Sequence, residues 1–158
     1  MTAIETATLV GLALSGVIAS FWDIRFRVLP NWLCALTLVA GLAMSFYAGG
    51  LTGAGSALAH AAIALVVCMG LWTAGAIGGG DAKFYAAIAS WFPLTSGIVL
   101  MVSVVLCGLV LLVIVFALRR LLNLPISKEA GDHGKLPYGV AISAGAIAAL
   151  VLPATLGL

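Results

Sequence analysis

The sequence has very little charge. Seven of its 158 residues are Lys or Arg and five are Asp or Glu, so charged residues make up 8% of the chain, whereas hydrophobic residues make up 64%. A soluble domain has about 25% charged residues, and one of about 150 residues still exposes roughly 30% of the surface of its unfolded chain. The composition therefore predicts a protein embedded in lipid. It excludes a disordered chain and, because the basic residues are few and scattered, a nucleic-acid-binding domain.

Cysteine is also scarce. Cys34, Cys68 and Cys107 are far apart, and each lies in an apolar run, so no C-x-x-C pair is available to bind zinc or carry out redox chemistry. A free cysteine behaves as a small hydrophobic residue, and we expect three buried structural thiols. The sequence predicts no metal site and no cofactor.

Long uncharged runs are abundant. A helix needs about 20 apolar residues to cross the roughly 30 Å hydrocarbon core of a membrane. A single helix over residues 82–118 would be about 55 Å long, so Pro93 is expected to divide it. The sequence predicts one all-α polytopic membrane domain over residues 1–158, with about six transmembrane helices, the fourth short. The predicted helices are 7–22, 32–47, 56–76, 82–92, 95–118 and 138–156.

The basic residues give an orientation for these helices. With six spans, the connections 23–31, 78–83 and 119–137 lie on one side of the membrane, and they contain every Lys and Arg of the chain. Basic residues concentrate in cytoplasmic connections. The sequence therefore predicts that this side is cytoplasmic and that both termini are external.

Two of the five acidic residues stand at this predicted boundary. Glu5 is close to the start of the chain, and Glu129 and Asp132 belong to a polar connection. Asp23, in contrast, lies at the end of the first predicted helix, and Asp81 lies at the start of the fourth. Ionisable residues at membrane depth are energetically expensive and often functional. Two carboxyl groups that share such a site do not both ionise easily. Aspartic proteolysis uses this asymmetry, because the charged group takes a proton from water and the neutral group polarises the scissile carbonyl.

Other interpretations of these residues stay open. Asp81 could be the N-cap of the fourth helix, and Asp23 could pair with Arg25 or Arg27 as an interfacial anchor. Two other functions are also compatible with the sequence: a small proton or solute conduit in which the aspartates relay protons, and a non-catalytic assembly protein. A relay favours acidic groups in mid-membrane, whereas both aspartates are predicted at one face.

Three polar residues near the predicted helices have structural interpretations. Lys83 follows Asp81 by two residues, so on a helix it points away from it and serves as an interfacial anchor. Asn31 is expected to be the N-cap of the second helix. His60 is expected to be packed within the third helix.

Two motifs carry a resemblance to a known family. Gly78-Gly79-Gly80-Asp81 fits the G-x-G-D pattern of membrane aspartic proteases, and D-I-R-F-R-V-L-P-N at residues 23–31 resembles the segment around the first aspartate of type IV prepilin peptidases. K-L-P-Y-G at residues 135–139 precedes the last predicted helix. Along nearly its whole length the chain resembles this family, in the short CpaA- or TadV-like form of Flp-type (Tad) pilus systems.

The resemblance implies an activity and a site. Asp23 and Asp81 would be the catalytic pair of an aspartic endopeptidase that removes the short basic leader from Flp-type prepilins, at the cytoplasmic face of the bacterial inner membrane. The implied partners are the prepilin precursor, as protein substrate, and the lipid bilayer. The residues expected to bind substrate or support the site are Gly78, Gly80, Lys135 and Tyr138.

The resemblance does not extend to methyl transfer. Full-length prepilin peptidases carry an amino-terminal cytoplasmic extension with paired C-x-x-C zinc ligands and also methylate the new amino terminus. This chain starts almost directly in its first predicted helix and has no such cysteines. Whether any methyltransferase activity remains therefore stays open, and S-adenosylmethionine is not assigned as a cofactor. The pilin that is cleaved and the oligomeric state stay open.

Overall fold

The computed structural model describes residues 2–122 and 137–156, and every regular element in these residues is helical. This confirms the all-α prediction. The elements are α1 (Ala3–Phe26), α2 (Asn31–Thr73), α3 (Gly79–Ala89), the short 3-10 helix η1 (Leu94–Ser96), α4 (Gly97–Leu121) and α5 (Tyr138–Leu156).

Both ends of α1 are defined by local interactions. At its start the Glu5 N–H donates to Thr2 Oγ1 over 3.2 Å, and the Thr2 N–H donates to Glu5 Oε2 over 2.9 Å, which is a capping box. At its end Arg27 has the left-handed conformation, with φ 55°, and its N–H donates to the Asp23 carbonyl. The left-handed residue stops the helix and sends residues 28–30 toward α2.

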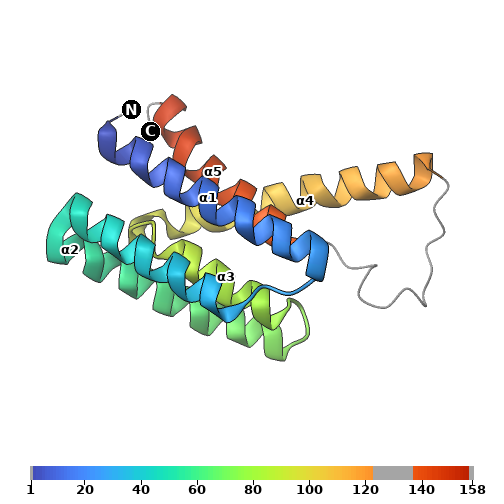
Figure 1. Ribbon diagram of the computed structural model, residues 1–158, viewed down its shortest axis with the longest axis horizontal. Helices are drawn as coiled ribbons and strands as arrows, with labels where there is room; N and C mark the ends of the chain where they lie inside the picture. Colours follow the sequence, from blue (N-terminus) through green and yellow to red (C-terminus); the bar gives the residue numbers. More distant parts are fainter. Residues whose placement is uncertain (1, 123–136, 157–158) are drawn as a thin grey trace.

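The long helix α2 is a hairpin of two antiparallel halves, residues 31–48 and 51–73 (Figure 1). The chain reverses at Gly49 and Gly50, both of which leave helical geometry. Gly50 has φ 61° and ψ −150°, a combination that is essentially restricted to glycine. The two halves correspond to the second and third predicted helices, and the reversal falls at the glycine pair between them.

The short helix α3 lies at the centre of the molecule and packs mainly against α2. Phe84 and Ile88 are completely buried, and the two alanines between them, Ala86 and Ala87, are also buried. At 1.5 Å per residue α3 is about 16 Å long, roughly half the thickness of a hydrocarbon core. The prediction of a short fourth helix is confirmed, and α3 alone is too short to cross a membrane.

Side chains of α2 form hydrogen bonds with the backbone groups of the non-helical turn after α3. Ser45 Oγ donates to the Ser90 carbonyl over 3.0 Å, and His60 Nδ1 lies 3.1 Å from the Phe92 carbonyl oxygen. The Leu94 N–H donates to Ser56 Oγ over 3.0 Å. Backbone groups without helical partners need such contacts where water is absent. His60 is therefore a packed, hydrogen-bonded residue, as expected.

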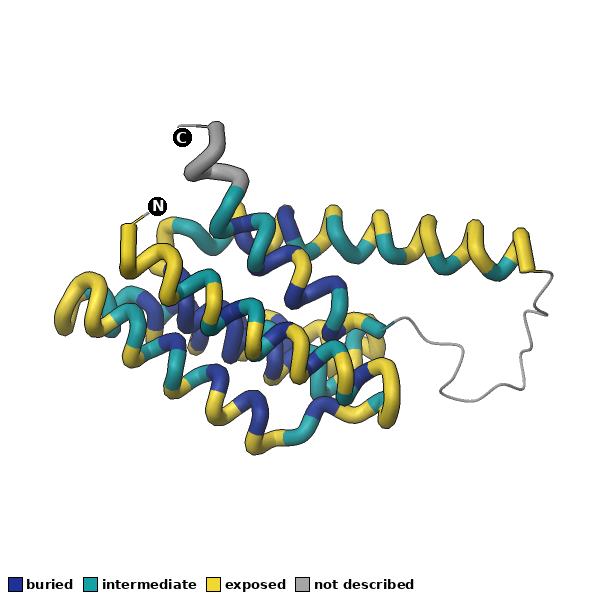
Figure 2. The backbone as a smooth tube through the Cα atoms, turned by 45° about the horizontal axis from the view of Figure 1, so that its top comes forward, coloured by how far each residue is buried: buried dark blue, intermediate teal, exposed yellow. Residues whose placement is uncertain are grey.

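Among the residues described, three helices are long and apolar enough to cross a membrane: Ala3–Phe26, Asn31–Thr73 and Leu94–Leu121. The last of these is very exposed, since α4 buries only Leu100 and Ser103 (Figure 2). An apolar helix this exposed is expected in lipid rather than in water. The number of crossings and their orientation stay predictions.

Several helices end on the same side of the bundle (Figure 1). The carboxyl-terminal end of α1, both ends of α2 and the amino-terminal end of α3 lie there, α4 projects past them in the same direction, and the Gly49-Gly50 reversal lies at the opposite end. This end carries the basic residues of the described part of the chain, while Lys128 and Lys135 lie outside that part. The basic residues at this end are Arg25, Arg27, Lys83, Arg119 and Arg120.

Candidate active site

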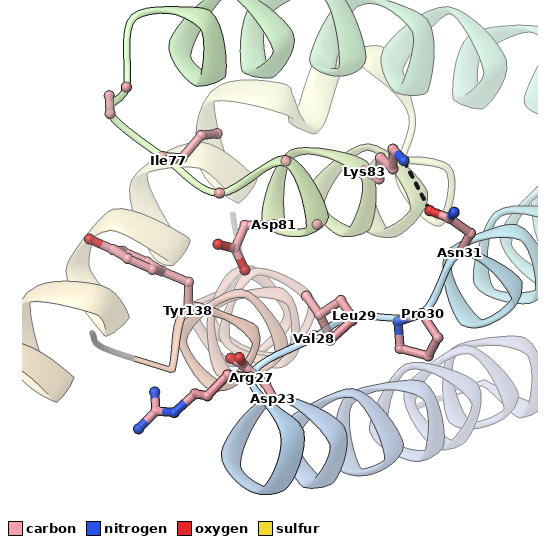
Figure 3. Close-up of a pocket in the computed structure, with 15 residues that line it drawn as sticks. Asp23, Arg27, Val28, Leu29, Pro30, Asn31, Ile77, Asp81, Lys83 and Tyr138 are labelled. Carbon is pink, nitrogen blue, oxygen red and sulfur yellow. Dashed lines mark hydrogen bonds between the residues drawn. The ribbon is translucent and has the colours of Figure 1, made fainter. Parts of the chain in front are cut away.

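A cavity of about 770 Å³ opens at this end of the bundle (Figure 3). Its wall comes from the last turn of α1, the link to α2, the loop between α2 and α3, the first turns of α3 and the first residue of α5. Binding cavities in proteins are typically about 300–1,000 Å³. The cavity therefore has room for a short peptide segment, and both Asp23 and Asp81 line it.

Asp23 lies in the last turn of α1 and is only 7% exposed. Its Oδ2 accepts a hydrogen bond of 2.7 Å from the N–H of Gly139, in the first turn of α5. The first N–H groups of a helix have no acceptor within the helix, and the positive end of the helix dipole favours an anion there. The start of α5 thus stabilises negative charge on Asp23.

Asp81 lies in the first turn of α3, three residues after Gly78, which occupies the N-cap position. The alternative that Asp81 itself is the N-cap is therefore wrong, although its side chain does accept a hydrogen bond from the Gly78 N–H. A Cβ atom at position 78 would lie 2.6 Å from Asp81 Oδ2. Glycine at position 78 is what allows this close approach.

The two aspartates interact electrostatically and face the same cavity (Figure 3). Asp81 lies outside the three helices that are long enough to span a membrane. Burial, and to a smaller extent the negative charge of Asp23, raise the pKa of Asp81 from its ordinary 3.8 to about 6, although the hydrogen bond from Gly78 acts in the opposite direction. One member of the pair therefore holds a proton much more readily than an isolated aspartate does.

The basic residues around the cavity have defined positions. Lys83 points away from Asp81, as expected, and its Nζ donates to Asn31 Oδ1 over 3.0 Å (Figure 3). The prediction that Asn31 is the N-cap of the second helix is wrong, because Pro30 occupies that position and Asn31 is the first helical residue. The amide side chain of Asn31 links α2 to α3 through Lys83. Arg27 also lines the cavity.

The other predicted site residues fall into two groups. Gly78, Gly80 and Tyr138 line the cavity, whereas Lys135 lies outside the described residues. Within the described part of the chain, no three His, Cys, Asp or Glu side chains come together as metal ligands.

Sequence reasoning missed the contact between Gly139 and Asp23. Gly139 belongs to the K-L-P-Y-G motif, but the motif alone does not indicate which side chain its N–H would meet. Leu29 is a further residue of the cavity wall that the sequence did not single out. A Cβ atom on Gly80 would lie 3.4 Å from the Leu29 Cβ, so the link after α1 packs closely against the glycine run.

Comparison with known proteins gives one match. The model of the type IV leader peptidase family matches residues 10–116, which is most of the chain and includes both aspartates and the glycine run. No curated protein and no solved structure matches the chain.

Proposed function

The chain belongs to the type IV leader peptidase family, and from this premise we propose that Asp23 and Asp81 are the catalytic pair of an aspartic endopeptidase. The observation that carries the proposal is that both carboxyl groups face one cavity and interact electrostatically. Asp23 alone would fit an interfacial anchor, and Asp81 alone would fit an acidic residue in the first turn of a helix. A coupled pair at a cavity fits an acid and base acting together.

The roles of the two aspartates follow from their surroundings. Asp23, which accepts the Gly139 N–H, is the ionised member and takes a proton from a water molecule in the cavity. Asp81, whose pKa is raised to about 6, is the member that takes up a proton more readily than an ordinary aspartate, and in its protonated form it donates a hydrogen bond to the scissile carbonyl oxygen. The water oxygen then bonds to the carbonyl carbon. When the C–N bond breaks, the leaving nitrogen takes a proton from the pair.

The proposed substrate is a Flp-type prepilin, cut between its short basic leader and its apolar helix. The cavity opens at the end of the bundle that carries the basic residues, and this end is cytoplasmic by the distribution of basic charge. The protein is then a multi-pass protein of the bacterial inner membrane with both termini external. A protein of this kind meets a prepilin leader before the pilin is exported.

Co-expression with a candidate Flp-type prepilin tests the proposal. Asp23→Asn and Asp81→Asn are each expected to reduce leader removal by at least about 100-fold, the usual contribution of a positioned acid or base. Leader removal is followed as a shift of the pilin band on a gel, and membrane fractions are blotted to compare the amounts of enzyme.

Glu5→Gln is the matched control, because it makes the same chemical change in an exposed acid at the opposite end of α1, and Gln also fits a capping box. This variant should process the prepilin normally. Full processing by either aspartate variant would show that the assignment of Asp23 and Asp81 as the catalytic pair is wrong. Failure of the wild-type protein to cleave any prepilin, with proton flux abolished by the same variants, would point to a conduit.

A further inference from the structure

Helices α1 and α5 pack closely along a line of small residues that ends at Asp23. A Cβ atom on Gly16 would lie 2.9 Å from the Ser143 Cβ, so the two backbones approach closely there. Ser143 Oγ lies 2.7 Å from the Gly139 carbonyl oxygen and 3.3 Å from that of Gly16. Ser143 thus connects the first turn of α5 to α1, one helical turn away from the contact with Asp23.

Gly139 has no room for a side chain. A Cβ atom at this position would lie 2.9 Å from Asp23 Oδ2, 3.1 Å from its Cβ and 3.3 Å from its Cγ. Real Cβ atoms essentially never come closer than 3.0 Å to another heavy atom. Any larger residue at position 139 would push the Asp23 carboxylate away from the N–H that it accepts.

The two aspartates obtain their backbone donors differently. Asp81 accepts from Gly78, three residues earlier in its own helix. Asp23 accepts from a residue 116 positions later in the chain. The position of Asp81 is therefore a local property of α3, whereas the position of Asp23 depends on how α5 packs against α1.

We propose that Gly139 is a positioning residue: the absence of a side chain lets the first turn of α5 hold Asp23 and stabilise its negative charge. The inference rests on the proposed function, in which Asp23 activates the water molecule. It adds that the K-L-P-Y-G motif acts through the backbone of its last residue. Gly139 itself is not one of the residues that line the cavity.

The kinetics of Gly139→Ala test this role. The purified full chain is assayed with a synthetic peptide that contains the basic leader and the first apolar residues of a Flp-type prepilin. We expect kcat to fall about 10- to 100-fold, the range for a hydrogen bond to a charged group, with KM unchanged. Gly55→Ala is the matched control, since Gly55 is an exposed helical glycine whose added Cβ would meet nothing within 4 Å.

A second measurement keeps the native Gly139. In protein labelled with ¹⁵N-glycine, the Gly139 amide proton is expected to resonate far downfield in the wild type and to move upfield in Asp23→Asn, because an amide is a weaker acceptor than a carboxylate. The Gly55 signal should not move. A Gly139 signal that does not respond to Asp23→Asn would overturn the inference.

The outcomes separate the two proposals. If Asp23→Asn is inactive but Gly139→Ala matches Gly55→Ala in both kcat and KM, the positioning role is wrong and the peptidase proposal stands. If Asp23→Asn is fully active, the peptidase proposal fails, whatever Gly139→Ala does. A rise in KM without a fall in kcat would assign Gly139 to substrate binding and would also overturn the positioning role.

Discussion

At the scale of the residue, the two aspartates differ in their surroundings rather than in their chemistry. Asp23 is nearly fully buried and meets the start of α5, and Asp81 lies in the first turn of α3 next to the glycine run. Burial and the neighbouring charge favour the neutral form of Asp81. Interacting groups titrate as a pair, so a change in one carboxyl group is expected to appear in the other.

We expect Asp23→Asn to lower the pKa of Asp81 from about 6 toward 3.8, because the amide removes the negative charge of Asp23 while the burial of Asp81 remains. Asp81 is neutral below its pKa and charged above it. Its protonated carboxyl band in the infrared spectrum should therefore disappear near pH 6 in the wild type and at lower pH in the variant. The spectrum of Asp81→Asn identifies the band. A midpoint that is unchanged or higher in Asp23→Asn would contradict the coupling.

At the scale of the element, two stretches of non-helical backbone are important: the reversal within α2 and the turn after α3. The hairpin of α2 depends on the backbone conformation of one glycine, and the turn after α3 depends on side chains of α2 that bond to its backbone. The first depends on the local conformation of the chain, whereas the second is held by tertiary hydrogen bonds.

The α2 reversal gives a matched pair of variants. Gly50→Ala is expected to destabilise the protein by about 1–3 kcal/mol, because Gly50 has φ 61° and ψ −150°, a region almost closed to other residues. Gly49→Ala should be close to wild type, because Gly49 has a negative φ. A Cβ atom on either glycine would meet nothing within 4 Å, so steric contacts do not differ. Thermal unfolding in detergent measures both variants, and equal melting temperatures would refute the conformational explanation.

At the scale of the whole molecule, the outer surface is apolar and the polar features gather at one end. Exposed Leu, Val, Ile and Phe side chains cover much of α1, α2 and α4. The cavity, the aspartates and the described basic residues share the end where α1 and α4 finish and α3 begins. This asymmetry fits a bundle in lipid whose cavity faces one aqueous compartment.

Labelling of single cysteines tests this orientation. Leu51→Cys, at the α2 reversal, and Leu122→Cys, after α4, are made in a variant in which the three native cysteines are replaced; both leucines are exposed. In whole cells, a maleimide that does not cross membranes should label Leu51→Cys from outside, and Leu122→Cys should react only after the inner membrane is permeabilised. Reversed labelling would place the cavity outside the cytoplasm, and labelling of both from one side would contradict the bundle's orientation in the membrane.

Much of this protein is determined by the sequence itself. The long continuous apolar runs specify the helical class, because a helix satisfies its own backbone hydrogen bonds in lipid, whereas the strands of a membrane barrel would alternate apolar and polar residues. The breaks at Gly49-Gly50 and around Pro93 follow from the local conformational preferences of glycine and proline. The choice of Asp23 and Asp81 followed from where the few charges stand relative to the helix ends. All of these are properties of short segments.

Only the tertiary structure decided which groups meet. The N–H of Gly139 reaches Asp23 across 116 positions, and Asn31 binds Lys83 rather than capping its own helix. Helical periodicity tells which face of a helix is buried, but not which residue of another helix lies opposite it, because that depends on the crossing geometry of the whole bundle. The sequence identified the two carboxyl groups, and the packing of α1, α3 and α5 decided that they share a cavity.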